Sequence, residues 1–192
     1  MKQICVLLAS PRKSGNTEAL TMHFVEHMRK YDVNCTIYNL YNMDIRPCVA
    51  CRHCQQDWST FNCWQKDDVQ EIFDSIMQCD SIILCSPIYS WYCTTQMKSL
   101  LDRLVYGMNK YYGEEKGPSL WKGKNVAIIT TCGYKVEKGA DLWEEGVKRY
   151  CKHSMLNYIG MLAKRHMGYK SIFMDDEKKQ SAIDFAQKIL EL

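Results

Sequence analysis

Short runs of apolar residues alternate along this chain with longer stretches in which apolar residues recur every three or four positions. Residues 4–9 and 81–85 are almost continuously apolar, which is typical of parallel strands buried on both faces of a sheet. Residues 33–40 alternate in part between apolar and polar side chains, and the pattern over 159–163 is weak. We predict strands at residues 4–9, 33–40, 81–85, 125–130 and 159–163.

Amphipathic helices are predicted between these strands. The first begins near Asn16 and places Leu20, Phe24, Met28 and Tyr31 on one apolar stripe. The second opens with Asp67 and Asp68, whose carboxylates suit the positive end of a helix dipole. Further helices are predicted from Thr94 to Met108, from Asp141 to Leu156 and from Asp176 to Leu190.

The alternation of strands and helices predicts an α/β fold, namely a doubly wound, five-stranded parallel sheet with helices on both faces. A chain of 192 residues suits one domain, here residues 1–192, with a cysteine-rich loop at 47–65 inserted between the second strand and the second helix. Ligands of such sheets bind beyond the carboxyl ends of the strands. We therefore expect the loops after the first, third and fourth strands to carry the function.

The charge balance argues against two classes of partner. The net charge is +3, and no run of five basic residues occurs, so we expect binding neither to nucleic acid nor to membranes. The apolar run at residues 4–9 is too short to span a bilayer, and no signal-peptide cleavage pattern follows it. We expect a cytoplasmic protein, in which the eleven cysteines are free thiols or ligands rather than disulfides.

The first strand-end loop has the composition of a site for a single phosphate. Its candidate residues are Ser10, Arg12, Lys13, Ser14, Gly15, Asn16 and Thr17. They offer polar side chains, positive charge, a glycine for a tight turn, and the N–H groups of a helix start. The loop matches neither the dinucleotide fingerprint nor the triphosphate loop. A simple capped turn is the alternative interpretation.

The loops after the third and fourth predicted strands have residues suited to binding a flat ring. Residues 86–92 combine a stiff proline with three aromatic residues, and residues 131–134 add a hydroxyl, a glycine and a tyrosine. Backbone groups can bond the edge of a heteroaromatic ring while aromatic side chains stack on its face. One phosphate joined to a flat ring describes FMN better than NAD or ATP. An ordinary loop with buried aromatic residues is the alternative.

The motifs ASPRKSGNT, IRPCVACRHC, CDSIILCSPIYSW and MKSLLDRL occur in this order between about Met1 and Gly133. Together they resemble the NADPH-dependent FMN reductase superfamily, which is flavodoxin-like in fold, and within it the iron–sulfur flavoprotein branch. The resemblance implies that the first loop holds the FMN phosphate. It implies ring binding by Pro87, Ile88, Tyr89, Ser90, Trp91, Thr131, Cys132 and Gly133, and a structural role for Lys98, Asp102 and Arg103.

The resemblance also implies the chemistry. NADH or NADPH reduces FMN, and FMN passes the electrons to a second acceptor, with no side chain acting as general acid or base. Members of the superfamily form homodimers or homotetramers. The histidines of this chain form no recognisable ligand spacing.

Four cysteines, Cys48, Cys51, Cys54 and Cys63, are candidate metal ligands. The compact spacing of the first three suits one face of a 4Fe-4S cluster, with the fourth completing it. Zinc also takes four thiolates but favours two separated pairs, and free or oxidised thiols are the third interpretation. The gap of eight residues before Cys63 leaves all three open. We expect this loop on the side of the sheet where FMN binds.

Two functions lead. The first is an FMN-dependent NAD(P)H oxidoreductase that reduces a small acceptor, such as a flavin, a quinone or a nitro- or azo-aromatic compound. The alternative is an iron–sulfur flavoprotein that exchanges electrons with a ferredoxin-like protein through FMN and a 4Fe-4S cluster. A third hypothesis is a non-catalytic FMN-binding or zinc-stabilised interaction protein.

Overall fold

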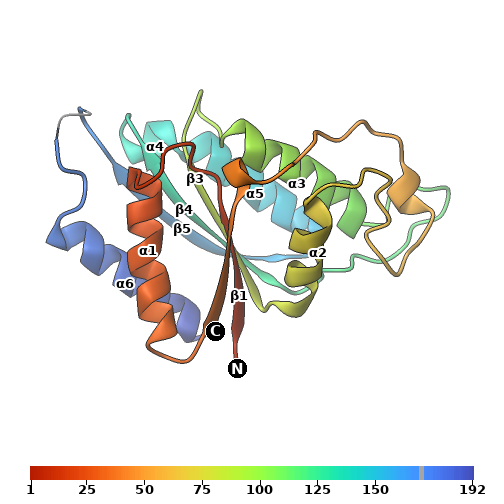
Figure 1. The fold of residues 1–192 in the computed structure, drawn as a ribbon, viewed down its shortest axis with the longest axis horizontal. Helices are drawn as coiled ribbons and strands as arrows, with labels where there is room; N and C mark the ends of the chain where they lie inside the picture. The colour runs from red at the N-terminus through yellow and green to blue at the C-terminus, as the bar shows by residue number, and fades with distance from the viewer. Residues whose placement is uncertain (169–170) are drawn as a thin grey trace.

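Five parallel strands form a single sheet at the centre of the molecule (Figure 1). The computed structural model describes residues 1–168 and 171–192. The strands lie in the order β2-β1-β3-β4-β5, so the chain reverses its direction of travel across the sheet after β2. Their bounds are β1 Gln3–Leu8, β2 Asn34–Asn39, β3 Ser81–Pro87, β4 Asn125–Cys132 and β5 Asn157–Arg165. The predicted fold class is confirmed.

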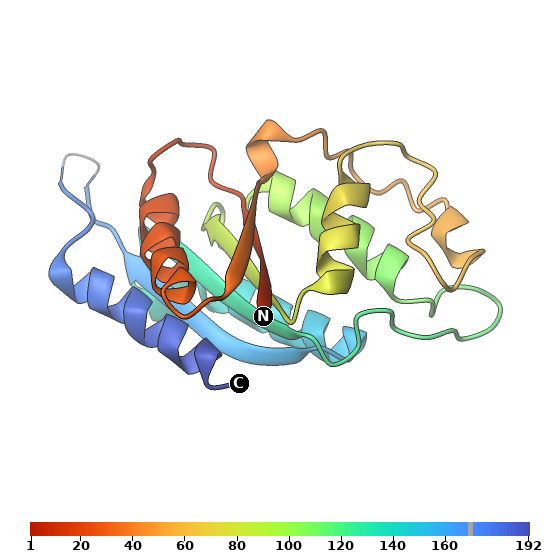
Figure 2. The same cartoon turned by 60° about the horizontal axis from the view of Figure 1, so that its bottom comes forward.

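Helices cover both faces of this sheet (Figures 1 and 2). The helices are α1 Asn16–Arg29, α2 Val69–Gln78, α3 Thr95–Met108, α4 Val136–Gly139, α5 Asp141–Ser154 and α6 Asp176–Leu190. Short 3-10 turns occur at Leu40–Asn42 and His53–Gln55. Helices α1 and α6 pack on one face, and α2, α3 and α5 pack on the other.

The alternation of side chains along β1 explains why two separate cores form. Ile4, Val6 and Leu8 point toward α1 and α6, whereas Cys5 and Leu7 point toward the helices of the opposite face. All five are at most 2% exposed. A strand covered on both faces needs apolar residues at every position, which is the pattern seen in the sequence.

Some predicted boundaries are wrong. Helix α1 ends at Arg29, so Tyr31 lies beyond it and is 57% exposed instead of completing the apolar stripe. Helix α2 begins at Val69, two residues after Asp67, whose carboxylate pairs with Arg103 and also accepts the Val69 N–H over 3.3 Å. Strand β5 is longer than predicted because an edge strand, half-buried along much of its length, shows a weak apolar pattern.

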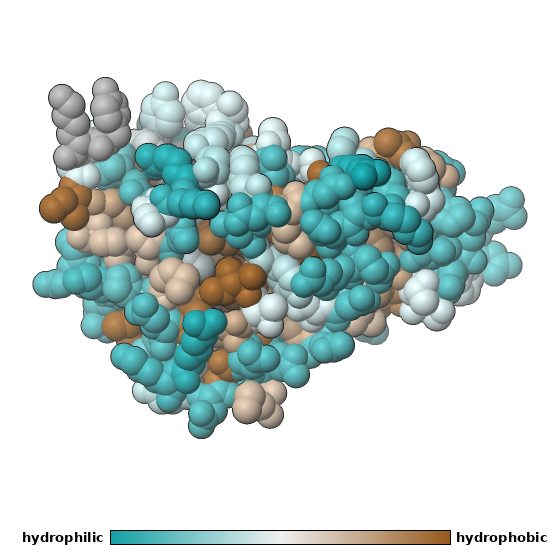
Figure 3. Space-filling view, viewed as in Figure 1, coloured by the Kyte–Doolittle hydropathy of each residue, from teal (hydrophilic) through white to brown (hydrophobic). Residues whose placement is uncertain are grey.

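In the view of Figure 3, apolar side chains are scattered among hydrophilic ones. None of the helices that the structure describes is long and apolar enough to cross a bilayer. Both termini lie at the amino edge of the sheet, where the Lys2 ammonium donates to the Leu190 carbonyl over 3.1 Å (Figures 1 and 2).

Candidate functional site

The carboxyl ends of β1, β3 and β4 surround a cleft of about 170 Å³, here named the strand-end cleft. These three strands are neighbours in the sheet, which is why loops far apart in sequence meet here. The cleft is lined by Arg12, Asn16, Pro87, Ile88, Tyr89, Thr131, Cys132, Gly133 and His166. All of these except His166 are among the predicted cofactor-binding residues.

The first loop makes a tight turn before α1. The carbonyl of Arg12 accepts bonds from the Ser10 hydroxyl (3.1 Å) and from the Gly15 N–H (3.2 Å). A Cβ atom on Gly15 would lie 2.9 Å from that carbonyl, so the turn requires glycine. No side chain caps the start of α1, which leaves its first N–H groups for a ligand.

Several predicted residues of this loop do not line the cleft. Lys13 and Ser14 are exposed, and the Ser14 N–H donates to the Glu18 carboxylate over 2.7 Å. The Thr17 hydroxyl lies 2.7 Å from the Thr131 hydroxyl, and both are buried. This bond joins α1 to the end of β4. Thr17 therefore holds two walls of the cleft together instead of lining it.

The second loop presents aromatic rings beside the cleft. Tyr89 and Tyr92 exchange backbone hydrogen bonds of 2.9 and 3.0 Å, and Ser90 and Trp91 between them have positive φ angles of 49° and 63°. This turn carries Trp91 outward, where it stacks on Tyr134 with ring centroids 5.7 Å apart and planes 16° apart. Ser90 and Trp91 thus line a second hollow of about 240 Å³, which shares Ile88, Cys132 and Gly133 with the strand-end cleft.

His166 is the cleft residue that sequence reasoning missed. It follows β5 directly, and its Nδ1 lies 2.8 Å from the Asn16 amide nitrogen. Parallel strands all end at the same edge of the sheet. A residue that directly follows the fifth strand is a candidate by position, but the predicted strand ended at residue 163, two residues before the observed end, and no ligand spacing marked His166.

Cys48, Cys51, Cys54 and Cys63 line one small apolar cavity, here named the cysteine cavity. Left-handed backbone at Ala50, Arg52 and Asn62 curls the loop around it. Across residues 1–168 and 171–192, no three histidine, cysteine, aspartate or glutamate side chains are arranged to hold a metal ion. The four cysteines thus share a cavity without converging on one point.

Two buried cations lie next to the cysteine cavity. Arg103 lines it, forms a bidentate ion pair with Asp67, and has a buried Nε without a hydrogen-bond partner among the described residues. Lys110 is fully buried and donates to the carbonyls of Cys54 (2.7 Å) and Thr60 (2.6 Å). Burial lowers the pKa of Lys110, and burial raises the pKa of the Cys54 thiol. Asp67 balances the charge of Arg103, whereas Lys110 forms no ion pair with a side chain in the described part of the chain.

The cysteine loop follows β2 along the chain but does not line the strand-end cleft. The cleft and the cysteine cavity share no lining residue. The loop projects past α2 and the end of α3 (Figure 1). Its base is closed by Asp44 and Asp68, because the N–H of each donates to an oxygen of the other, over 2.7 and 3.1 Å. The loop packs on α3 because Arg103, Tyr106 and Lys110 supply its contacts.

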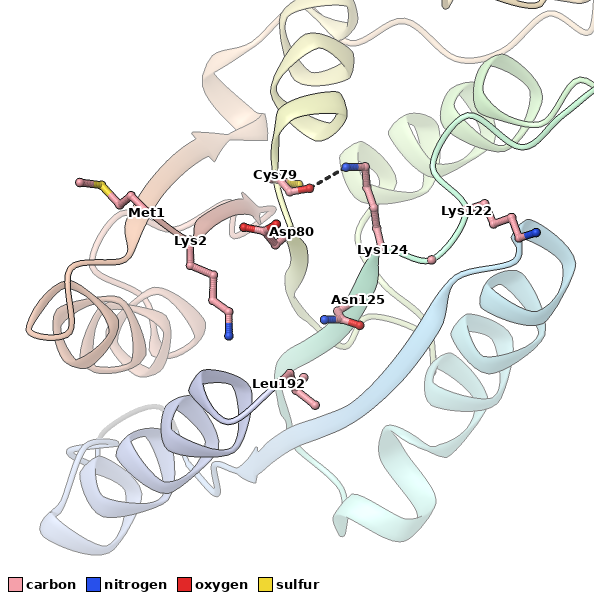
Figure 4. Close-up of a pocket in the computed structure, with 9 residues that line it drawn as sticks. Met1, Lys2, Cys79, Asp80, Lys122, Lys124, Asn125 and Leu192 are labelled. Carbon is pink, nitrogen blue, oxygen red and sulfur yellow. Dashed lines mark hydrogen bonds between the residues drawn. The ribbon is translucent and has the colours of Figure 1, made fainter.

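A third hollow, of about 630 Å³, lies at the opposite, amino edge of the sheet (Figure 4). Two of its three lysines are bonded to the backbone: Lys124 donates to the Cys79 carbonyl over 2.6 Å, and Lys2 donates to the Leu190 carbonyl. Lysines in this position stabilise the carboxyl ends of helices, here α2 and α6. This hollow therefore has a structural explanation.

Residues 2–141 match the NADPH-dependent FMN reductase family. The chain belongs to this family. The matching segment includes the first three cleft loops and the cysteine loop, but ends before His166. The family assignment confirms the resemblance seen in the sequence motifs.

Individual relatives agree with this assignment. The chain is 32% identical to an iron–sulfur flavoprotein of Methanocaldococcus jannaschii over 94 residues, which are 49% of this chain and 47% of the relative. It is 27% identical to an FMN-dependent NADH:quinone oxidoreductase of Albidiferax ferrireducens over 126 residues, 64% of this chain and 61% of the relative. The first of these matches spans about half the length of the curated relative.

A solved structure shows the same fold. The FMN-dependent NADH-azoreductase of Bacillus anthracis, in complex with FMN, superposes with a TM-score of 0.69 at 14% identity. The superposition covers 100% of this chain and 98% of the azoreductase. The architecture is therefore flavodoxin-like across the whole sheet.

Proposed function

We propose that this protein is an FMN-dependent NAD(P)H oxidoreductase that reduces a small acceptor, such as a flavin, a quinone or a nitro- or azo-aromatic compound. The strand-end cleft carries the proposal. It brings Arg12 and Asn16 together with the backbone of residues 87–89 and 131–133 at the edge where such sheets bind ligands.

The residues present fit FMN. Arg12, Asn16 and the uncapped start of α1 supply positive charge and donors for a phosphate. Residues 87–89 and 131–133 form the walls that would hold the ring. FMN, when bound, supplies the acceptance of hydride and the onward transfer of electrons. The protein would bind and orient the ring through these walls.

Exposed aromatic rings at the mouth of the cleft support a flat acceptor. Tyr89 is 50% exposed, Trp91 47% and Tyr134 61%. Large exposed aromatic surfaces favour stacking with flat, weakly polar molecules. The same surface suits a subunit contact, in keeping with our expectation of a homodimer or homotetramer.

Anaerobic purification followed by titration with FMN tests the proposal. Flavin fluorescence is expected to be quenched at one FMN per chain, and NADH or NADPH is expected to bleach the bound flavin. Re-oxidation by a panel of quinones, free flavins and azo dyes then identifies the acceptor. A chain that binds no FMN would rule out this function.

The cysteine cavity favours a second candidate, an iron–sulfur flavoprotein that exchanges electrons with a ferredoxin-like partner. Four thiols around one cavity, beside a buried Arg103 Nε without a partner, suit an anionic cluster whose sulfur atoms accept hydrogen bonds. Cys48, Cys51, Cys54 and Cys63 would hold this cluster, which supplies one-electron transfer. Relatives named as iron–sulfur flavoproteins add support.

Iron and sulfide assays on anaerobically purified protein separate the two candidates. If the protein is an iron–sulfur flavoprotein, we expect about four irons and four sulfides per chain, as in a 4Fe-4S cluster. We expect the Cys63→Ser variant to lose them. Cys35→Ser is the matched control, since Cys35 lies on β2 outside the cavity. Protein that binds flavin but contains no iron would rule out the iron–sulfur flavoprotein and support the FMN-dependent oxidoreductase.

A further inference from the structure

His166 follows β5 directly and lies beside the start of α1. Its Nδ1 faces the Asn16 amide nitrogen at 2.8 Å, and its Nε2 faces the carbonyl oxygen and the hydroxyl of Ser171 at 3.2 and 3.1 Å. The ring also packs edge-on against Phe173, with centroids 5.4 Å apart. Contacts in three directions therefore fix the position of a partly buried imidazole.

These contacts also fix which ring nitrogen carries the hydrogen. The Ser171 carbonyl can only accept, so Nε2 bears a hydrogen and donates it. The single hydrogen of the Ser171 hydroxyl points to the carbonyls of Gly168 (2.8 Å) and Met167 (3.1 Å), so this oxygen also accepts from Nε2. The Asn16 NH₂ group is a donor, so Nδ1 accepts its bond. His166 thus presents Asn16 with an acceptor.

This acceptor fixes the orientation of the Asn16 amide. The NH₂ group has two hydrogens, and the bond to Nδ1 uses one of them. The second is left for a ligand of the strand-end cleft, which Asn16 lines together with Arg12. A half-turn of the amide would bring its oxygen against Nδ1, so that two acceptors would face each other. His166 therefore selects the orientation in which Asn16 donates.

The start of α1 makes this selection necessary. Asn16 is the first residue of α1, and no described side chain caps this helix start. The oxygen of an asparagine side chain readily accepts from such free N–H groups, and it would then cover the place where an anion binds. Because the amide nitrogen of Asn16 is held by His166, the N–H groups stay free for the ligand.

We propose that His166 is a positioning residue for the phosphate group of FMN: its Nδ1 holds the Asn16 amide so that the second N–H donates to a phosphate oxygen. No covalent bond changes, and the imidazole keeps its hydrogen on Nε2. His166 lies beyond residue 141, where the match to the family ends. The inference rests on the FMN binding proposed above.

A comparison of FMN with riboflavin, which lacks the phosphate, isolates this role. His166→Leu removes the acceptor and is expected to weaken FMN binding roughly three- to tenfold, the effect of one hydrogen bond, and riboflavin binding less than about twofold. A role in the fold alone would weaken both flavins alike. His166→Asn is the conservative variant, because its amide oxygen can accept at the position of Nδ1. It is expected to recover most of the FMN affinity, measured by fluorescence titration.

A double-mutant cycle tests whether His166 acts through Asn16. In the Asn16→Ala background, His166→Leu is expected to cause no further loss of FMN affinity, because the amide that it orients is gone. Nitrogen NMR of the wild-type protein is expected to show a hydrogen on Nε2 and none on Nδ1, with and without FMN.

Three results would overturn the proposal and leave the flavin site intact. They are equal losses of FMN and riboflavin affinity in His166→Leu, additive losses in the double variant, and a hydrogen on Nδ1. Absence of FMN binding by the wild-type protein would overturn both this proposal and the proposed function.

Discussion

Arg103 of α3 and Asp67, which precedes α2, form a bidentate ion pair with N–O distances of 2.7 and 3.0 Å. The two side chains are 1% and 0% exposed. Arg103 also donates to the Arg46 carbonyl over 2.9 Å, and Asp67 accepts the Arg46 N–H over 3.2 Å. The pair therefore fixes both ends of the cysteine loop to the same helix.

Removing one member of this pair is expected to be costly. Asp67→Asn leaves a buried guanidinium without its counter-charge, so we expect a loss of about 3 kcal/mol of unfolding free energy, measured by urea denaturation. Asp102→Asn is the control, because its ion pair with Lys98 is about half exposed and is expected to contribute under about 1 kcal/mol. Equal effects of the two substitutions would contradict the prediction.

The same pair predicts a pH dependence. Burial opposes the ionisation of Asp67, but the bonds from Arg103 and Arg46 outweigh it and hold the pKa below its ordinary value. A depressed pKa contributes stability that is fully present above the unfolded-state pKa and is lost as the pH falls through the folded-state pKa. Urea midpoints are thus expected to fall with acidification more steeply in wild type than in Asp67→Asn.

The buried hydroxyl pair of Thr17 and Thr131 predicts non-additive substitutions. Thr17→Val leaves the Thr131 hydroxyl buried without its partner, which is expected to cost about 1–2 kcal/mol. The double variant with Thr131→Val removes both polar groups and is expected to cost less than the sum of the two single variants. A double-mutant cycle by thermal denaturation measures the coupling, and strict additivity would show that the two hydroxyls act independently.

The contact between α3 and the cysteine loop predicts a position that tolerates only glycine. A Cβ atom on Gly107 would lie 2.1 Å from the Phe61 ring, which is 1% exposed. Gly107→Ala is therefore expected to destabilise the protein by about 1–3 kcal/mol, and Phe61→Leu is expected to recover part of the loss. Gly113→Ala, whose nearest contact would be 3.5 Å, serves as control. The measurement is calorimetric melting of Gly107→Ala, of the double variant Gly107→Ala with Phe61→Leu, and of the control Gly113→Ala.

Negative charge in the first loop is expected to expel FMN. The double substitution Ser14→Glu with Asn16→Asp places one carboxylate in the strand-end cleft, at position 16, and a second in the exposed turn before α1. Both negative charges would repel a phosphate in the cleft. We expect FMN affinity to fall by more than about 100-fold, given the roughly 1.4 kcal/mol per tenfold change. Ser14→Gln with Asn16 unchanged is the control, because it enlarges the side chain at position 14 without adding charge. It is expected to bind FMN more tightly than the charged variant. Unchanged affinity in the charged variant would place the phosphate elsewhere.

The strength of the apolar pattern determined how much of the fold could be predicted. Residues 4–9 and 81–85 lie in strands covered on both faces, so nearly every position had to be apolar and the strands were evident. The edge strand β5 lacked this signal because many of its residues are half-buried. Its extent, and hence the position of His166 at its end, required the three-dimensional sheet.

The candidate site likewise contains residues that the sequence could predict and residues that it could not. Arg12, Asn16 and residues 87–89 were predictable because each follows a strong strand and parallel strands end together. The bonded state of the Thr17 hydroxyl was not, since it depends on which side chain lies opposite. The cysteine spacing indicated that the four thiols could lie together, but the cavity that they share and the direction of the loop depend on contacts such as those of Arg103 and Gly107 with it.

The two hydrogen bonds between Asp44 and Asp68 make the cysteine loop structurally independent of the sheet. Its two ends are held beside each other by one backbone bond and by one bond from the Asp44 N–H to the Asp68 carboxylate, and no strand pairing passes through the segment between them. Evolution can therefore lengthen, shorten or replace the segment without altering the register of the sheet or the walls of the strand-end cleft. The four cysteines can in this way be gained or lost without any change to the residues that line the cleft.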